Sequence, residues 1–574
     1  MTAETYAATS WMPQRVSPVS KYGMVAAKMP QAAQIGADIL AGGGNAVDAA
    51  VATAFAIGVC EPAMNGLGGG GYMVVWLARE QRALVIDYHM RSPQAATPGM
   101  YPLVDPDSAE AGFFGWPVTE GNRHVMGPHS IAVPGTLAGL ALALKEFGTM
   151  SLAEVIAPSI ALAEDGFPVA WFITNSIAKA VTSIRTYPET AKVFLRPDGD
   201  VPFTMEQADP AMIRQPELAE TLRRIAAEGP DVFYKGEIGQ KIAAYLQAEG
   251  TIFSADDLAG YEAKIVEPHA VKYHGHTVYT IPGGTGGTSL AQALNALNHV
   301  DTAGGSARDL HTVAHVFRQA FADRFAYLAD PEHGEVPIDA LLGDDYARRT
   351  IEAVGDRATT PTPGERTDLG VSHLLDASVP EYMKDGSTTH LNVIDAEGNA
   401  VSLTQTLLAL FGSRVTIPGT GVLMNNGMMW FDPEPGRPNS VSGGKKPLTN
   451  MAPALVVNSG TIVASVGASG GRKIMNCNAQ QIMNIVDRGL SAQEAIDAPR
   501  IDCSTRSLVM SNREDPATGE QLAAMGYTVE TRHEGLLTSD FSSPTAIRRS
   551  PDGLLDGGCD PWYFPATVVG VEGS

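Results

Sequence analysis

Two pairs of strand-like segments in the last third of the chain place the strongest limit on its fold. Residues 388–395 alternate between apolar and polar side chains, a turn-forming stretch follows at 395–399, and 400–407 resume the alternation. Residues 454–458 and 461–466 form a second pair around a Ser-Gly step. Alternation interrupted by a short turn predicts an antiparallel hairpin with one face turned towards a core. The sequence therefore predicts sheets that stack on one another.

Helical and further strand-like segments surround these hairpins. Helices are expected at 31–40, 46–59, 290–329, 473–488 and 492–498, with a mainly helical stretch from 137 to 245. Further strands are expected at 72–77, 83–88 and 277–281. Asn45 is the expected N-cap of the second helix. Helices that cover stacked sheets predict a mixed α/β fold.

The overall charge limits the partners of the chain. Its 574 residues hold 40 Lys and Arg against 63 Asp and Glu, which gives a net charge of −23. A binder of nucleic acid or of an anionic membrane needs a basic face, so we expect neither partner. A small or weakly charged molecule is the expected partner. The length allows about two to four domains or one large interwoven fold.

Cysteine content and apolar runs indicate the compartment. Four cysteines are too few for a disulfide scaffold: Cys60, Cys477, Cys503 and Cys559. The most apolar stretch, 46–60, is too short to span a membrane and contains Asp48. Residues 1–20 have no apolar core and only Arg15 as a basic residue, unlike a secretory signal. The cytoplasm is therefore the expected location.

Glycine runs and paired histidines do not predict a cofactor or metal. Residues 66–71 satisfy G-x-G-x-x-G, but a helix precedes the glycines and a strand follows, which reverses the dinucleotide-binding order. Residues 283–288 lack the lysine of a P-loop. We expect both runs to be sites of close backbone packing. His311 and His315 have helical spacing but no acidic residue between them, so we expect no metal site.

Residues 467–471, Gly-Ala-Ser-Gly-Gly, match the nucleophile elbow G-x-S-x-G between a predicted strand and helix. Ser469 is then a candidate nucleophile. Its partners would have to be His533, the one histidine downstream, with Asp487 or Asp540. Alternatively, the Gly-Gly step presents backbone N–H groups at a helix N-terminus and binds an oxyanion.

A second candidate nucleophile opens the first hairpin at Thr388. Cleavage of the chain before this residue would place an α-amino group and a hydroxyl on the same threonine. An α-amino group has a pKa of about 7.7–8.0, so it can accept the hydroxyl proton near neutral pH. Such a hydrolase needs no Ser-His-Asp set.

The chain resembles the γ-glutamyltransferase family of N-terminal nucleophile (Ntn) hydrolases. Colinear blocks carry the resemblance across nearly the whole sequence: 23–27, 39–50, 61–62, 65–72, 133–135, 321–324, 387–390, 398–406, 425–426, 446–453 and 467–471. The resemblance implies a four-layer αββα sandwich. It also implies self-cleavage into a large subunit, 1–387, and a small subunit, 388–574, which form one interwoven heterodimeric unit.

The resemblance also implies roles for individual residues. Thr388 would attack the Ser387 carbonyl during maturation and the substrate amide afterwards. Thr406 matches the threonine that hydrogen-bonds the nucleophile, and Gly470 and Gly471 match the oxyanion-hole pair. A small-molecule amide would be the substrate, and no cofactor is implied.

The chain departs from the family pattern where the glutamyl head group binds. His89 occupies the position of the carboxylate-binding arginine, with Arg91 two residues further on, and Thr449-Asn450 replace a serine pair. Leu408 replaces an asparagine, and Trp430 lies where an acidic residue is expected. A substrate ammonium without a counter-charge in a partly dry pocket binds poorly. We therefore expect a free γ-glutamyl donor such as glutathione to be disfavoured.

The segment that covers the pocket in related proteins is short here, at 432–446. Met428, Met429 and Trp430 are expected either at the rim of an open pocket, which would suit a bulky apolar acyl group, or packed beneath the loop. These features resemble the branch of the family that includes cephalosporin-acylase-like amidohydrolases.

Together these features predict a self-processed amidohydrolase that forms an acyl-enzyme on Thr388, with hydrolysis favoured over transfer. Two alternatives remain open. One is a serine hydrolase built on Ser469. The other is an unprocessed, inactive homologue that only binds its ligand.

Overall fold

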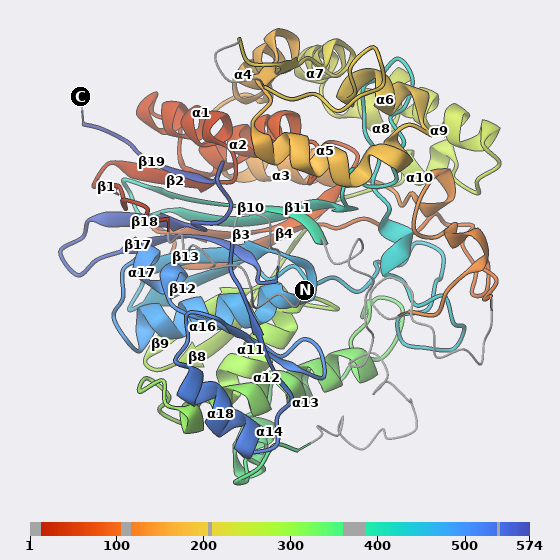
Figure 1. Ribbon diagram of the computed structural model, residues 1–574. Coiled ribbons are helices and arrows are strands. Elements are labelled where there is room, and N and C mark those ends of the chain that lie inside the picture. The colour runs from red at the N-terminus through yellow and green to blue at the C-terminus, as the bar shows by residue number, and fades with distance from the viewer. Residues whose placement is uncertain (1–12, 105–115, 205–208, 360–385, 536–539, 574) are drawn as a thin grey trace, which may run out of the picture.

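Two seven-stranded sheets stack face to face, and helices cover both outer faces (Figure 1). The structure is a computed structural model that describes residues 13–104, 116–204, 209–359, 386–535 and 540–573. The predicted mixed α/β fold is confirmed, and the hairpins expected from the alternating segments lie in the two sheets.

The first sheet carries the predicted nucleophile at its centre. Its strand order is β19-β2-β10-β11-β3-β4-β7, and all neighbours are antiparallel. The strands are β19 (Thr567–Gly570), β2 (Gly23–Ala27), β10 (Gly386–Asp395), β11 (Ala400–Ala409), β3 (Gly70–Leu77), β4 (Arg82–Tyr88) and β7 (Lys264–Val266).

The second sheet has the order β1-β18-β17-β13-β12-β9-β8 and is also antiparallel. Its strands are β1 (Val19–Ser20), β18 (Leu555–Cys559), β17 (Ser543–Arg549), β13 (Thr461–Ser469), β12 (Ala454–Asn458), β9 (His276–Thr280) and β8 (His269–Tyr273). Each sheet thus combines strands from before and after residue 388.

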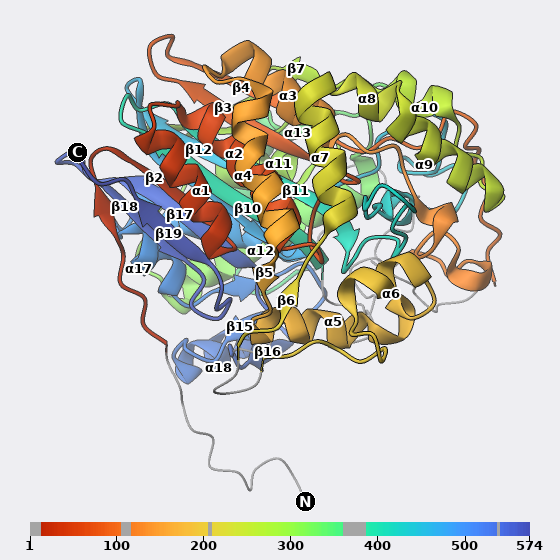
Figure 2. The same cartoon turned by 90° about the horizontal axis from the view of Figure 1, so that it is seen from above.

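Helices α1, α2, α4 and α7 lie side by side over the first sheet (Figure 2). The helices on this side are α1 (Pro30–Ala41), α2 (Ala46–Cys60), α3 (Thr136–Phe147), α4 (Leu152–Asp165), α5 (Trp171–Ile184), α6 (Pro188–Phe194), α7 (Pro216–Glu228), α8 (Asp231–Tyr234), α9 (Glu237–Ala248) and α10 (Ala255–Ala259).

The other outer layer covers the second sheet. Its helices are α11 (Gly286–Leu297), α12 (Ala307–Tyr327), α13 (Ile338–Leu341), α14 (Asp344–Glu352), α16 (Ile474–Val486), α17 (Ala492–Asp497) and α18 (Pro516–Ala524). The predicted helix at 290–329 is therefore two helices. Smaller sheets comprise β14 (Ile501–Asp502), β15 (Leu508–Ser511) and β16 (Val529–Arg532), and the pair β5 (Phe167–Pro168) and β6 (Met212–Ile213).

Helix α2 begins where the sequence predicts. The Asn45 side chain accepts hydrogen bonds from the backbone N–H groups of Val47 and Asp48, and the Asp48 carboxylate accepts one from the Asn45 N–H. This reciprocal capping satisfies N–H groups that have no partner within the helix. The helix is apolar on almost every side because it packs between neighbouring helices and the strands β10 and β11. None of the helices in the described part of the chain is long and apolar enough to cross a membrane.

The two sheets meet closely behind β10, the strand that carries Thr388. A Cβ atom added to Gly467 on β13 would lie 2.1 Å from the His390 ring on β10, so this contact requires glycine. Hydroxyl groups also bridge the sheets, because Ser402 donates to the Val466 carbonyl at 3.0 Å and Ser465 donates to the Asn392 side chain at 2.6 Å. The sheets are therefore held in a fixed relative position at the site.

Replacing Gly467 by alanine is expected to lower the free energy of unfolding by about 1–3 kcal/mol, because the added methyl group overpacks this contact. Gly334→Ala is the matched control, since no atom lies within 4 Å of its added methyl group. Urea unfolding measures both variants. Equal midpoints for the two would show that the sheets separate easily and that the close contact is unimportant.

Candidate catalytic site

Thr388 lies at an irregularity in the hairpin of β10 and β11. Ser387 pairs with Leu408, but Thr389 pairs with Gln405, so the register shifts between them. Strand β11 therefore contains one extra residue opposite Thr388. Bulges of this kind bend a strand and redirect a side chain. Leu408 also has a φ of 89°, a strained conformation for a residue other than glycine.

Two threonine hydroxyls converge on the carbonyl group of Ser387. Thr388 Oγ1 donates to this carbonyl oxygen at 2.6 Å, and Thr406 Oγ1 donates to it at 2.5 Å. The two hydroxyl oxygens are 3.2 Å apart. Thr406 Oγ1 in turn accepts the Leu408 N–H at 2.8 Å. All three hydroxyl-bearing residues 387, 388 and 406 are buried.

This geometry suits nucleophilic attack on the Ser387–Thr388 peptide. Hydrogen bonds to a carbonyl oxygen stabilise the negative charge that develops there when a nucleophile adds to the carbon. The Thr388 hydroxyl already lies against the same carbonyl group. Ser387 is held from its other side, since its hydroxyl donates to the Ala63 carbonyl at 2.6 Å.

The predicted oxyanion residues lie at the end of β13, beside the nucleophile strand. Gly470 and Gly471 have φ values of 141° and 63°, which glycine adopts without strain. A Cβ atom on Gly470 would lie 2.7 Å from Ser542 Oγ. The short 3₁₀ helix η8 (Gly471–Lys473) packs beside β10. The structure thus brings the Gly-Gly step next to β10, the strand that carries Thr388.

The residues that the Ser469 hypothesis requires do not form a triad. His533 hydrogen-bonds Asn512 at 2.9 Å, and Asp487 hydrogen-bonds His274 at 2.7 Å. Ser469 lies on β13, paired with Ser543 on β17. Both His533 and Asp487 are therefore engaged elsewhere.

His89 and Trp430, predicted to contact substrate, lie together. The His89 ring is 5.7 Å from the Trp430 ring and 5.4 Å from the Tyr72 ring, measured between centroids. Its Nε2 atom is 3.2 Å from the Pro447 carbonyl oxygen. Burial lowers the pKa of His89 to about 4, so the imidazole is neutral at pH 7. His89 therefore does not supply the positive charge of the arginine that the family resemblance leads us to expect at its position.

Arg91 and the Thr449-Asn450 pair have other partners. The Arg91 guanidinium is 3.5 Å from the Glu332 carboxylate. Arg324 on α12, which is 2% exposed, donates to the Thr449 carbonyl at 2.5 Å and to Asn450 Oδ1 at 3.0 Å. Sequence reasoning assigned Arg324 no role, although a charged residue on the apolar face of a helix, between Phe321 and Phe325, was a usable signal.

The aromatic and methionine residues that precede the short covering segment are buried. Met428, Met429 and Trp430 belong to the core, with exposed fractions of 1%, 0% and 4%. Asn439 donates to the Trp430 carbonyl at 2.6 Å and so ties the segment down. The expectation of an open rim at these residues is wrong, and the alternative of packing beneath the loop is confirmed.

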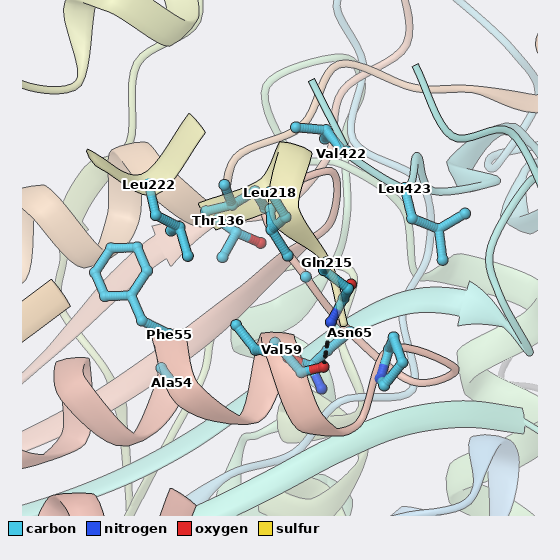
Figure 3. Close-up of a pocket in the computed structure, with 15 residues that line it drawn as sticks. Ala54, Phe55, Val59, Asn65, Thr136, Gln215, Leu218, Leu222, Val422 and Leu423 are labelled. Atoms are coloured by element: carbon cyan, nitrogen blue, oxygen red, sulfur yellow. Dashed lines mark hydrogen bonds between the residues drawn. The ribbon is translucent and has the colours of Figure 1, made fainter. Parts of the chain in front are cut away.

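The glycine-rich run 66–71 packs directly against the hairpin of β10 and β11. Cβ atoms on Gly69 and Gly71 would lie 2.4 Å from the carbonyl oxygens of Thr406 and Thr404. The expected close backbone packing is confirmed here. Between α2, α7 and the other side of this run lies an apolar pocket (Figure 3), where Gln215 donates to the Val59 carbonyl at 2.8 Å. None of the predicted catalytic residues lines this pocket.

No group of three potential metal ligands occurs among the residues that the structure describes. His311 hydrogen-bonds the Tyr527 hydroxyl at 2.9 Å and the Gly355 carbonyl at 3.0 Å, and His315 is buried on the same helix. His311 therefore makes hydrogen bonds within the fold, and His315 is packed in the interior.

Stacked antiparallel sheets between helical layers, with a hydroxyl nucleophile candidate at the start of a central strand, are the features of an Ntn-type hydrolase. Residues 32–566 match the protein family described as gamma-glutamyltranspeptidase. The chain is 36% identical to the acylase ACY 1 proenzyme of Pseudomonas sp. strain SE83, over 96% of this chain and 94% of that protein. It is 35% identical to the glutathione hydrolase proenzyme of Bacillus subtilis strain 168, over 85% and 82% respectively.

Comparison with solved structures points to the same family. The crystal structure of a cephalosporin acylase from Bacillus halodurans superposes with a TM-score of 0.85, at 28% identity and over 100% of both chains. The chain belongs to the gamma-glutamyltranspeptidase family. It is a hydrolase of that family, whose relatives described as proenzymes include an acylase and glutathione hydrolases.

Proposed function

We propose that the chain is an amidohydrolase that cleaves itself between Ser387 and Thr388 and then uses Thr388 as an N-terminal nucleophile. The observation that carries this proposal is the convergence of the Thr388 and Thr406 hydroxyls on the Ser387 carbonyl oxygen, at 2.6 and 2.5 Å. Relatives described as proenzymes support processing of the chain.

In maturation, Thr388 Oγ1 adds to the Ser387 carbonyl carbon while Thr406 stabilises the oxyanion. The C–N bond then breaks, the hydroxyl proton passes to the Thr388 nitrogen, and an ester joins Ser387 to Thr388. Water hydrolyses this ester. The products are a carboxylate on Ser387 and a Thr388 that carries both a free amine and a free hydroxyl.

In turnover, the Thr388 amine accepts the hydroxyl proton as Oγ1 adds to the carbonyl carbon of the substrate amide. The backbone N–H groups of Gly470 and Gly471 hold the oxyanion. The proton then passes to the leaving amine, and an acyl-enzyme remains on Thr388. Water, activated by the same amine, hydrolyses the acyl-enzyme and restores the nucleophile.

We further propose that residues 1–387 and 388–574 become the large and small subunits of a heterodimer. The sheet composition supports this, because both sheets combine strands from the two segments. Once the Ser387–Thr388 bond is broken, hydrogen bonds between neighbouring strands still join the two pieces. The interwoven arrangement predicts that they remain associated.

The substrate that we propose is an N-acyl amide whose acyl group lacks a free α-amino acid head. Neutral His89, packed between Tyr72 and Trp430, supports an acyl site without a fixed charge at that position. The name of the acylase relative also supports an N-acyl amide as the substrate.

The substrate proposal predicts an order of reactivity. We expect kcat/KM for N-acyl amides with apolar acyl groups to exceed that for glutathione at least about tenfold, since one unpaired buried charge costs more than 1.4 kcal/mol. A panel of chromogenic anilides, with glutathione assayed beside them, measures this order. Glutathione as the best substrate would contradict the interpretation of the head-group residues.

Trapping the acyl-enzyme tests the proposed mechanism. The processed enzyme is mixed with an activated ester, quenched in acid within seconds, and digested for mass spectrometry. We expect the acyl mass on the peptide that begins with Thr388. An adduct on the peptide containing Ser469, with none on Thr388, would refute the assignment of the nucleophile.

A further inference from the structure

A buried group of ionisable side chains lies behind the nucleophile hairpin and takes no part in the steps above. Lys28 follows strand β2, Glu61 caps the C-terminus of α2, and Tyr563 follows β18. Lys28 and Glu61 have exposed fractions of 0% and 1%. A buried charge is costly unless it has partners, so the contacts of this group require an explanation.

Glu61 connects to strand β11 of the hairpin. The Tyr563 hydroxyl donates to Glu61 Oε1. Asn65 Nδ2 lies 3.5 Å from Glu61 Oε2, and Asn65 Oδ1 accepts from Gln405 Nε2 at 2.8 Å, one residue before Thr406. Burial raises the pKa of Glu61 to about 7, against the lowering effects of the Thr389 and Tyr563 hydroxyls.

Lys28 connects to the loop that contains Gly470 and Gly471, here called the oxyanion loop. Its ammonium group donates to the carbonyl oxygen of Ser543 at 2.5 Å and to the hydroxyl of the same residue. Ser543 pairs with Ser469, immediately before Gly470, and Ser542 packs on Gly470. Tyr563 lies between the two charges, with Lys28 Nζ 4.7 Å from its ring centroid and its hydroxyl on Glu61.

The ionisable groups that face Lys28 and Glu61 come from several elements. They are Cys60 on α2, His390 on β10, Cys477 on α16, Cys559 on β18, and Asp560 and Tyr563 beyond β18. Burial raises the pKa of the three thiols and of Tyr563, and lowers the pKa of His390 to about 3. These groups are therefore neutral near pH 7. Glu61, and Lys28, whose pKa burial lowers to about 8, instead change charge near the pH range in which the amine titrates.

We propose that Lys28, Glu61 and Tyr563 form a buried positioning group that aligns the nucleophile strand with the oxyanion loop and controls the charge of the Thr388 amine. This inference rests on the proposed function, because the amine exists only after cleavage at Thr388. None of the three touches the reacting atoms, so they act through Asn65, Gln405 and Ser543.

The two charges have opposite effects on the amine. A nearby carboxylate favours the ammonium form, and a nearby ammonium disfavours it. The amine accepts a proton only when it is neutral, so its pKa sets the acidic limb of the pH profile of kcat/KM. Removal of the Glu61 charge is expected to move this limb to lower pH, and removal of the Lys28 charge to higher pH.

The test compares Glu61→Gln, Lys28→Met and Tyr563→Phe with the wild type and with Asp257→Asn. Asp257 is a matched control, since it is a 7% exposed carboxylate that accepts hydrogen bonds from the Gln94 N–H and the Ser254 hydroxyl at α10, in another part of the fold. We expect shifts of about half a pH unit or more, in opposite directions, for Glu61→Gln and Lys28→Met. We expect self-cleavage to slow at least about tenfold in Tyr563→Phe with little change in thermal midpoint, and no change of either kind in the control.

Shifts in the same direction, or wild-type profiles in both charge variants, would overturn the inference. If either charge variant does not fold, the cleavage rate of Tyr563→Phe decides alone, since only one hydroxyl is lost. A wild-type rate in that variant would contradict the positioning role. If the proposed function itself is wrong, the wild-type protein will remain uncut. That outcome is distinct from a failure of the present inference, which concerns only differences between the variants and a processed wild type.

Discussion

The Thr388→Ala variant is expected to remain a single chain of 60.4 kDa and to turn over no amide. Without Oγ1, the Ser387 carbonyl has no nucleophile and no amine is released. Loss of a catalytic nucleophile costs on the order of 10⁴–10⁶-fold in kcat. A denaturing gel after prolonged incubation and an amidase assay measure the two losses.

Two matched variants separate the possible nucleophiles. Thr388→Ser keeps a hydroxyl and, after cleavage, an amine, so it should still cut itself and retain activity. Ser469→Ala should behave as the wild type, because His533, the histidine that a triad would need, hydrogen-bonds Asn512 instead. Activity that survives in Thr388→Ala but disappears in Ser469→Ala would favour the serine hydrolase instead.

The second large effect is expected for Thr406→Val. Valine has the shape of threonine but cannot donate to the Ser387 carbonyl oxygen or accept the Leu408 N–H. Loss of one donor to a developing oxyanion typically slows the step about 10²–10³-fold. The rate of self-cleavage, followed from freshly made chain by gel densitometry, should fall by this amount.

Thr406→Ser serves as the control for this variant, since it restores the hydroxyl. We expect it to cleave at close to the wild-type rate. Rapid cleavage of Thr406→Val would show that the short contact to the carbonyl oxygen does not assist the reaction. Thermal unfolding of both variants identifies any loss of rate that comes from misfolding.

Local patterns predicted the elements and the positions of the main candidates. Strand alternation located both hairpins, and Asn45 marked the start of α2, because these signals depend on neighbouring residues. The register shift opposite Thr388 was not predictable, since it arises from how β11 pairs with β3 on its other side as well as with β10. The burial of Trp430 likewise depends on residues distant in sequence, such as Tyr72 and His89.

The residues missed from the sequence share one physical feature. Lys28, Glu61 and Arg324 are charged residues in otherwise apolar or small-residue surroundings, and such residues are seldom fully buried. A sequence does not reveal that Tyr563 meets Glu61 from the far end of the chain, 502 positions away. Contacts of that range follow only from the stacking of the two sheets.

The N-terminal sequence of the smaller piece tests the central claim most directly. Freshly purified wild-type protein, incubated at neutral pH, should separate on a denaturing gel into pieces of about 40 and about 20 kDa from a chain of 60.4 kDa. Edman degradation of the smaller piece should begin Thr-Thr-His-Leu, starting at Thr388. A chain that stays intact while it hydrolyses its amide, or a first residue other than Thr388, would contradict the account.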